Sequence, residues 1–335
     1  MRLLVRIIFI LSLLVCFNQC IKVQLPDLGL LIIKFVTAEG IKCQSYISNN
    51  GGAGITERGF MWKAETEAEY NNKKVAFDNG TNQFETIIFG LTPGTTYTLK
   101  AYVINTEGTS FSEEKTITTS RKGTFTNSRD TMTYKWVEIN DQIWMADNLA
   151  YMPYISTVLN NSGIFVYNYK GTSPVEAKGT REYKTYGCFY EVKVSNYVCP
   201  DGWHLPSEDE WESLEIYLGI TRREASWLGS HGTNQADYLK EAGTSHWLSP
   251  NDWANNCTCF SALPGGLCTG YYISGDPIPV FGGLGSFADF LSNESLYEPY
   301  CYWELSSTSR CIYKDFAHYG GIYYRAAYSI RCVKD

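Results

Sequence analysis

Apolar and polar side chains alternate along the first third of the chain. In the segment TYTLKAYVIN, residues 96–105, the side chains of Tyr97, Leu99, Ala101 and Val103 fall on one side of an extended backbone. This period of two is the pattern of a half-buried strand. Similar short segments are separated by glycine, asparagine, proline and threonine turns, so the pattern predicts an all-β sandwich over residues 28–120.

The pattern changes to a helical period near residue 207. Ser207 followed by Glu210 is a capping box, in which each side chain satisfies a backbone N–H of the other residue. Trp211 and Leu214 then begin an apolar stripe on one helical face, and Gly219 ends the helix. Thr221 and Glu224 repeat the capping box. The sequence therefore predicts a helix that begins at residue 207, followed by a second short helical turn.

The polar residues around this helix invite a catalytic or metal-binding interpretation. The acidic residues of SEDEWE, 207–212, are explained by the positive end of the helix dipole. His204 has no second histidine four residues away, as a zinc-binding helix would require, and the chain's other histidines are also not at ligand spacing. We expect His204 to be a hydrogen-bonded structural residue, and we expect no metal and no cofactor.

The amino terminus has the pattern of an export signal. Arg2 and Arg6 precede an apolar run over residues 7–17, which is too short to span a bilayer as a helix. The run ends before Cys20, the cysteine that would be lipidated in a bacterial lipoprotein signal. Small residues usually precede that cysteine, and residues 17–19, Phe-Asn-Gln, depart from this pattern. We predict a signal peptide over residues 1–20 and lipidation at Cys20.

Composition excludes some partners. The net charge of −7 comes from interspersed acidic and basic residues, with no clustered basic patch for nucleic acid. After the signal there is no further apolar run of membrane-spanning length, so we expect membrane attachment through the lipid only. Eight of the eleven cysteines lie between residues 188 and 332. In an exported domain this even number permits four disulfides, and their order alone leaves the pairing open.

Two stretches carry a resemblance to known families. The segment LTPGTTYTLKAYVINTEGTSFSEE, 91–114, with ITERGFMW, 55–62, resembles fibronectin type III modules common in exported Bacteroidetes proteins. This resemblance implies that residues 28–120 serve as a spacer. The polar stretch SRKGTF, 120–125, is a plausible junction. Beyond it the chain becomes rich in tryptophan and tyrosine.

Residues 125–335 resemble the Fibrobacter succinogenes major paralogous domain, a family of exported bacterial proteins. The resemblance rests on five ordered blocks: FTNSRDTMTYKWVEINDQIWMADNLAY (125–151), CPDGWHLPSEDEWESL (199–214), FSALPGG (260–266), YWELSSTS (302–309) and SIRCVKD (329–335). More distantly, WHLPSEDEWESL with RCVKD looks like the formylglycine-generating-enzyme branch of C-type-lectin-like folds. That likeness implies an α+β domain in which the first block and the terminal strand lie together, and a disulfide between Cys199 and Cys332. Such a long loop closure would stabilise the domain by about 3–5 kcal/mol.

The chain also departs from the family pattern. Additional cysteines stand where the family usually has other residues, and Glu304 and Leu305 interrupt a Trp-Ser-Ser run. We expect the additional cysteines to form local disulfides: Cys188, Cys257, Cys259, Cys268, Cys301 and Cys311. A metal cluster is the alternative, and an anaerobic habitat would leave some of the cysteines as thiols.

Three functions remain open. Formylglycine-generating activity uses a copper-binding cysteine pair, and the segment GNVWEW that would precede the terminal strand is not found, so we expect no catalytic residues. Binding of glycan or polysaccharide is the leading prediction, with ligand-facing aromatics at Tyr271, Tyr272, Tyr323 and Tyr324. Calcium-dependent sugar binding is not expected, because Glu298-Pro299 is followed by Tyr300 instead of asparagine. The alternative is a structural role at the cell surface with protein partners. In each case we expect an exported protein of the outer membrane or cell surface of a Gram-negative, Bacteroidetes-like bacterium.

Overall fold

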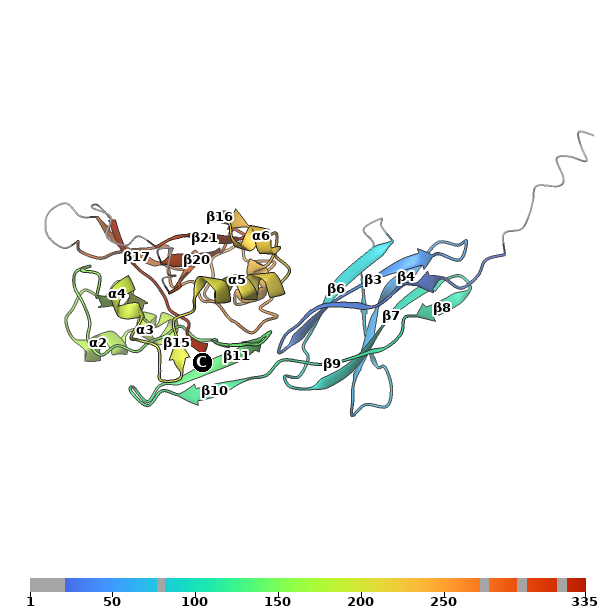
Figure 1. Ribbon diagram of the computed structural model, residues 1–335, viewed down its shortest axis with the longest axis horizontal. Helices are drawn as coiled ribbons and strands as arrows, with labels where there is room; N and C mark the ends of the chain where they lie inside the picture. Colours follow the sequence, from blue (N-terminus) through green and yellow to red (C-terminus); the bar gives the residue numbers. More distant parts are fainter. Residues whose placement is uncertain (1–21, 77–81, 272–276, 294–299, 318–323) are drawn as a thin grey trace, which may run out of the picture. The chain divides into compact units, whose positions relative to one another are not determined.

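The computed structural model describes residues 22–76, 82–271, 277–293, 300–317 and 324–335 (Figure 1). The chain divides into two compact units and is mostly β-sheet with a few short helices. Unit 2 comprises residues 33–42, 87–96 and 118–335, so two segments of the expected sandwich cluster with it. In the described part, the helices are all too short or too polar to cross a membrane.

The amino-terminal strands form two sheets. One has the order β1-β3-β2 with β6 on β3, and the other β5-β4-β7-β8 with β9 on β7. The rings of Phe60 on β4 and Phe84 on β6 lie 5.3 Å apart, which joins the two sheets through a buried aromatic contact. The strand expected at 96–105 is β7, with its apolar face buried. The bounds are β1 (Asp27–Leu28), β2 (Ile32–Val36), β3 (Gly40–Asn49), β4 (Glu57–Ala64), β5 (Asn72–Val75), β6 (Gln83–Phe89), β7 (Thr96–Asn105), β8 (Gly108–Phe111) and β9 (Lys115–Thr118).

The terminal strand organises the first sheet of the carboxy-terminal region. The sheet order is β10-β11-β12-β23-β15, and Val333 on β23 pairs with Trp144 on β12 and with His204 on β15. The last residues of the chain therefore lie between the first and second sequence blocks, as the resemblance implied. The bounds are β10 (Lys122–Thr126), β11 (Thr133–Ile139), β12 (Gln142–Met145), β15 (Trp203–His204) and β23 (Val333–Lys334).

Three smaller sheets and short helices complete this region (Figure 1). The sheets are β13-β14, β16-β21-β20-β19 and β18-β17-β22. Their strands are β13 (Ile164–Phe165), β14 (Phe189–Tyr190), β16 (Gly229–His231), β17 (Leu267–Tyr271), β18 (Val280–Gly282), β19 (Phe287–Leu291), β20 (Cys301–Ser306), β21 (Ile312–Phe316) and β22 (Tyr324–Ala327). The helices are α2 (Pro174–Gly179), α3 (Arg181–Tyr186), α4 (Val192–Ser195), α5 (Glu208–Tyr217), α6 (Arg222–Ala225) and α7 (Ala236–Leu239).

Both predicted capping boxes are present. Ser207 accepts a hydrogen bond from the N–H of Glu210, and the Glu210 carboxylate accepts one from the N–H of Ser207. Thr221 and Glu224 make the same pair of bonds at the start of α6. Gly219 has φ 102°, a left-handed conformation that glycine adopts without a steric cost. Helix α5 thus begins at Glu208 and ends before this glycine, as the sequence predicts.

The buried side of α5 carries the centre of the core. Trp211 packs against four aromatic rings that come from different parts of the chain, with the Trp303 ring parallel to it at 5.2 Å. The other three are Trp144 at 4.8 Å and Phe260 and Phe290 at 5.9 Å each. Each buried aromatic contact adds roughly 0.5–1.5 kcal/mol beyond area burial. Trp211 is thus the residue on which most of the sequence blocks converge.

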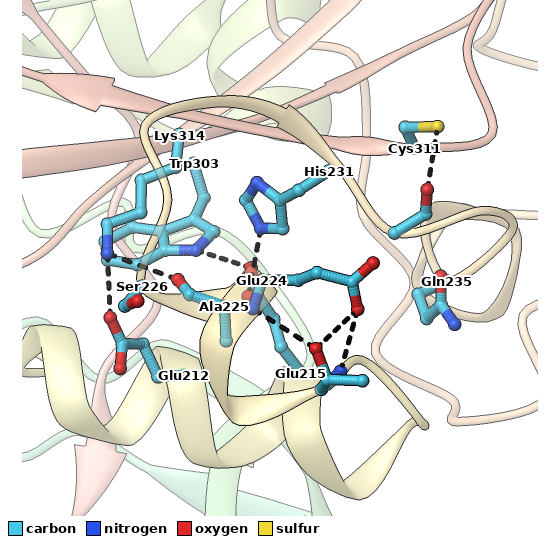
Figure 2. Close-up of polar contacts among 12 residues, drawn as sticks. Glu212, Glu215, Glu224, Ala225, Ser226, His231, Gln235, Trp303, Cys311 and Lys314 are labelled. Atoms are coloured by element: carbon cyan, nitrogen blue, oxygen red, sulfur yellow. Dashed lines mark hydrogen bonds and ion pairs between the residues drawn. The ribbon is translucent and has the colours of Figure 1, made fainter.

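A second set of contacts on α5 is ionic (Figure 2). The Glu215 carboxylate accepts hydrogen bonds from Trp303 Nε1 at 2.7 Å and pairs with His231 Nε2 at 3.0 Å, with both partners of the ion pair buried. Lys314 on β21 is also buried, and its Nζ pairs with Glu208 and with Glu212, the latter at 2.8 Å. These pairs attach α5 to β16, β20 and β21.

His204 occupies a structural position. Its Nδ1 lies 2.6 Å from an Asp335 carboxylate oxygen and its Nε2 lies 2.9 Å from Glu210 Oε1. The histidine thereby connects the end of the chain to the capping box of α5. This agrees with the expectation of a hydrogen-bonded structural residue.

One disulfide joins Cys199 to Cys332, the two cysteines paired by the resemblance. The expectation of local disulfides among the additional cysteines is wrong for Cys188, Cys257, Cys259, Cys268 and Cys311, which are thiols. The physical reason is placement: Cys188 lies in the core around Tyr190, Cys268 lies in a separate cluster, and Cys311 donates to the Gly232 carbonyl instead.

The Glu215–His231 pair predicts a pH-dependent contribution to stability. Burial lowers the pKa of His231, but the hydrogen bond to Glu215, the charge of Glu215 and the hydrogen bond to the Gly229 carbonyl together outweigh it, so the pKa is raised above its ordinary value. The stabilisation is therefore full below the unfolded pKa of about 6.5 and is lost as pH rises through the folded pKa. We expect His231→Ala to cost about 3–5 kcal/mol at about pH 6, because it leaves the buried Glu215 unpaired.

Urea unfolding of wild type and of His231→Gln, measured as a function of pH, checks the predicted pH dependence of stability. The glutamine variant should lose the part of the pH slope above about pH 6.5 that wild type shows. His246→Gln, which changes a histidine of intermediate exposure paired with Glu241, is the matched control. An unchanged slope in His231→Gln would contradict the assignment.

Candidate functional site

The loop that follows α7 has an unusual backbone. Asn256, Cys259 and Ser261 have φ of 50°, 59° and 55°, the left-handed region that residues other than glycine seldom adopt. Such conformations persist only where surrounding contacts over-determine them, and they gather at functional sites. Here the Asn256 side chain holds the loop, because its Oδ1 accepts from the Ser261 N–H and its Nδ2 donates to Ser261 Oγ, both at 2.8 Å.

Arg331 holds the same loop from inside the core. Its guanidinium is fully buried, donates to the carbonyl of Phe260 and to that of Ser261 at 2.8 Å, and donates through Nε to Asn148 Oδ1 at 3.0 Å. The guanidinium also lies 4.4 Å from the Phe260 ring centre. Burial, partly offset by the charge of Asp147, lowers the pKa of Arg331 to about 9, so the side chain stays charged at neutral pH.

A groove of about 460 Å³ lies beside this loop within unit 2. It is lined in part by Trp136 on β11, a half-buried residue that pairs with Gly123 on β10. A Cβ atom at residue 123 would come within 2.8 Å of the Trp136 ring, so the glycine lets the indole lie against the neighbouring strand. The groove residues are Glu39, Lys122, Gly123, Thr124, Lys135, Trp136, Ala146, Asn256, Cys259 and Ser261.

The electrostatics of the groove suit binding. Lys122 and Glu39 form an ion pair, and the hydrogen bond from Lys122 lowers the pKa of Glu39. Burial, followed by the charge of Glu39, raises the pKa of the Cys259 thiol to about 12. The thiol is therefore neutral at physiological pH, whereas nucleophilic or metal-ligating cysteines are thiolates. The groove offers an aromatic face, ammonium groups, an amide and hydroxyls, which can stack and form hydrogen bonds.

The predicted ligand-facing tyrosines are only partly described. Tyr271 on β17 and Tyr324 on β22 are register partners, so the structure brings their backbones together. Tyr272 and Tyr323 lie outside the described residues, as does Cys20. Trp136 was not predicted as a groove residue, although it lies in the first sequence block. A glycine within a strand often marks close approach of another group, but Gly123 lies in the stretch predicted to be a junction, which the structure shows to contain the start of β10.

Comparison with known families supports a relationship over most of this region. Residues 137–334, more than half of the chain, match the model of the Fibrobacter succinogenes major domain. No curated protein matches the chain. Among solved structures, the chain is similar to the sensor domain of the anti-sigma factor RsgI4 in Pseudobacteroides cellulosolvens. That match has 19% identity, covers 29% of this chain and 97% of the other, and has a TM-score of 0.23, which carries no structural argument.

Arg331→Met should destabilise the carboxy-terminal domain by about 3 kcal/mol or more, because the Phe260 and Ser261 carbonyls and Asn148 would lose their buried donor. Arg331→Lys keeps the positive charge, but the compact ammonium group lacks the planar fork that lets arginine reach three acceptors. We therefore expect an intermediate loss of stability. Urea unfolding followed by tryptophan fluorescence measures both variants. A methionine variant as stable as wild type would show that the loop does not depend on the guanidinium.

Proposed function

The chain belongs to the Fibrobacter succinogenes major domain family, and on this premise we propose that it is a non-catalytic, exported cell-surface protein that binds glycan. The binding site is the groove beside Trp136. The fibronectin type III-like sandwich is the spacer, and the carboxy-terminal domain has a C-type-lectin-like arrangement. The export pattern of Arg2 and Arg6 and the position of Cys20 support a lipid-attached protein at the outer membrane or cell surface.

The observation that carries the proposal is the Trp136 indole in a groove of about 460 Å³. A volume of this size is in the range of small-molecule sites and accommodates a sugar ring. A pyranose presents a face of C–H groups, which packs on an aromatic ring, and a rim of hydroxyl groups. Asn256, Ser261 and the ammonium groups of Lys122 and Lys135 lie around the indole and can bond to that rim.

The chemistry of the groove also supports binding without catalysis. Catalysis by a cysteine or a copper-binding cysteine pair requires thiolates, and burial raises the pKa of Cys259 and of the nearby Cys257. In the described part of the chain, no cluster of three or more histidine, cysteine, aspartate and glutamate residues is arranged to hold a metal ion. Formylglycine-generating-like activity is therefore the weaker alternative.

A role in protein assembly is the second candidate, and two exposed tryptophans favour it. Trp227 and Trp253 are 47% and 56% exposed, and each lies beside an arginine, Arg223 at 5.8 Å and Arg310 at 5.1 Å from the ring centres. Tryptophan and arginine dominate the binding energy of many protein interfaces. These residues lie outside the groove, so the two functions can be separated by substitution.

Trp136→Ala should weaken glycan binding by about ten-fold or more, because it removes the stacking face while leaving the polar rim. A glycan array and pull-down with insoluble polysaccharides identify the ligand, and titration calorimetry measures its affinity. Trp253→Ala, which removes an indole outside the groove, is the matched control and should bind glycan like wild type.

Equal glycan affinity of Trp136→Ala and wild type would contradict the assignment of the groove. Blank results on both glycan screens would refute glycan binding as a whole. In that event, crosslinking in cells that captures a protein neighbour with wild type and not with Trp253→Ala would favour assembly.

A further inference from the structure

A second, smaller pocket lies where β17, β19, β20 and β22 meet. Its volume is about 80 Å³, room for two or three water molecules at ~30 Å³ each. One wall is apolar and the other is acidic. The lining residues are Leu267, Cys268, Thr269, Asp289, Tyr302, Glu304, Ala326, Ala327 and Tyr328. None of them lines the groove beside Trp136, so this pocket is independent of the proposed glycan site.

Asp289 is the unexplained group in this pocket. Its side chain is only 5% exposed, and its Oδ1 is buried with no hydrogen-bond partner. A buried polar atom without a partner costs roughly 1–3 kcal/mol, and more if the group is charged. A native structure that keeps such a group in a pocket therefore points to a partner that is bound from outside.

Glu304 places a second carboxyl beside the first. Asp289 and Glu304 are register partners on β19 and β20, so both side chains are on the same face of the sheet. Glu304 is half-buried, and Tyr302, two residues before it, shares that face. The Tyr302 ring stacks on Tyr328 at 5.2 Å and completes one wall. Asp289 therefore lies deep in the pocket, with Glu304 and Tyr302 nearer to solvent.

The chain supplies no cation to these carboxyls among its described residues. Burial, and then the charge of Glu304, raise the pKa of Asp289 well above its ordinary value. Burial alone raises the pKa of Glu304. Outside the described residues, the stretches after residue 22 contain a single basic residue, His318, and no lysine or arginine. An external cation is therefore the simplest partner for the pair.

The character of the pocket selects the kind of cation. Calcium takes six to eight oxygen ligands, and two carboxyls with one or two hydroxyls fall short of that number. An alkylammonium has a compact head with three N–H donors and an apolar stem. The head can donate to Asp289, Glu304 and the Thr269 hydroxyl, while the stem packs against Ala326 and Leu267.

We propose that the pocket formed by Asp289, Glu304, Tyr302 and Thr269 binds a primary alkylammonium group, borne by a free amine or by a lysine side chain. Binding restores a counter-charge and hydrogen bonds to the buried Asp289. Because the site shares no residue with the groove, loss of amine binding and loss of glycan binding are separate outcomes.

Titration calorimetry of the full chain with n-butylammonium chloride tests the proposal. We expect saturable binding with a millimolar dissociation constant, and no binding of 1-butanol, the neutral analogue of the same length. Asp289→Asn should weaken binding by about ten-fold or more, because a charge-assisted hydrogen bond is lost. Glu304→Gln should weaken it less, since Glu304 is closer to solvent.

Asp252→Asn, which changes an exposed aspartate outside the pocket, is the matched control and should bind like wild type. Asp289→Asn should melt no lower than wild type, because a neutral amide removes the cost of a buried carboxyl. If Asp289→Asn does not fold, the weaker ammonium binding expected of Glu304→Gln tests the proposal instead. Proton release on binding, measured in two buffers of different ionisation enthalpy, is expected for wild type and not for Asp289→Asn.

Comparison of n-butylammonium with Nα-acetyl-lysine amide distinguishes the two sources of the ammonium. Tighter binding of the lysine derivative indicates a protein partner, and equal or weaker binding indicates a free amine.

Absence of n-butylammonium binding overturns the proposal, as does equal binding by wild type and Asp289→Asn. Calcium binding that Asp289→Asn abolishes, without ammonium binding, would make this a metal site. A large gain in ammonium affinity in His318→Gln would mean that the chain supplies its own counter-ion.

Discussion

The carboxy-terminal domain depends on the burial of one charge, the guanidinium of Arg331. A buried cation must be hydrogen-bonded on all sides or it destabilises the fold. Arg331 meets this requirement by donating to two carbonyls of the 256–262 loop and to Asn148, while its flat face lies against Phe260. The geometry of the loop and that of the terminal strand are therefore determined together.

The core beside Arg331 joins sequence blocks that lie far apart in the chain. Arg331 belongs to the last block and Phe260 to the third, while Trp144, Trp211 and Trp303 come from the first, second and fourth. The four aromatic residues meet in one buried cluster around Trp211, and the Arg331 guanidinium lies on the Phe260 ring of that cluster. Because the rings pack directly against one another, a substitution in one block alters the packing of the others. The blocks are thus parts of one core.

The polar residues of the second block belong to the same structure. Glu210 closes the capping box and bonds to His204, and Glu215 pairs with His231 beneath the helix. The acidic residues that invite a catalytic interpretation thus form hydrogen bonds and ion pairs that hold helix α5 to its neighbours. The groups that we propose for binding lie elsewhere, at Trp136 and at Asp289.

The features that could be predicted from the sequence are those determined by local patterns. The strand at 96–105 follows from alternation, and the start of α5 follows from Ser207 and Glu210, because each depends on residues at most a few positions apart. The expectation of local disulfides is wrong for five of the additional cysteines, because the packing of the core determines which side chains lie next to each thiol. The pairing of Asp289 with Glu304 could not be seen either, since it depends on the register of two strands.

The difference between fully buried and half-buried positions indicates where ligand specificity can vary within such a domain. Core positions such as Trp211 and Arg331 are fully buried and restricted by packing, whereas Trp136 and Glu304 are half-buried. Glu304 stands in the block YWELSSTS, residues 302–309. A serine there would leave Asp289 as the single carboxyl of its pocket and would halve the negative charge offered to a ligand. The pocket chemistry can therefore change through one half-buried strand position while the buried cluster, and with it the fold, stays the same.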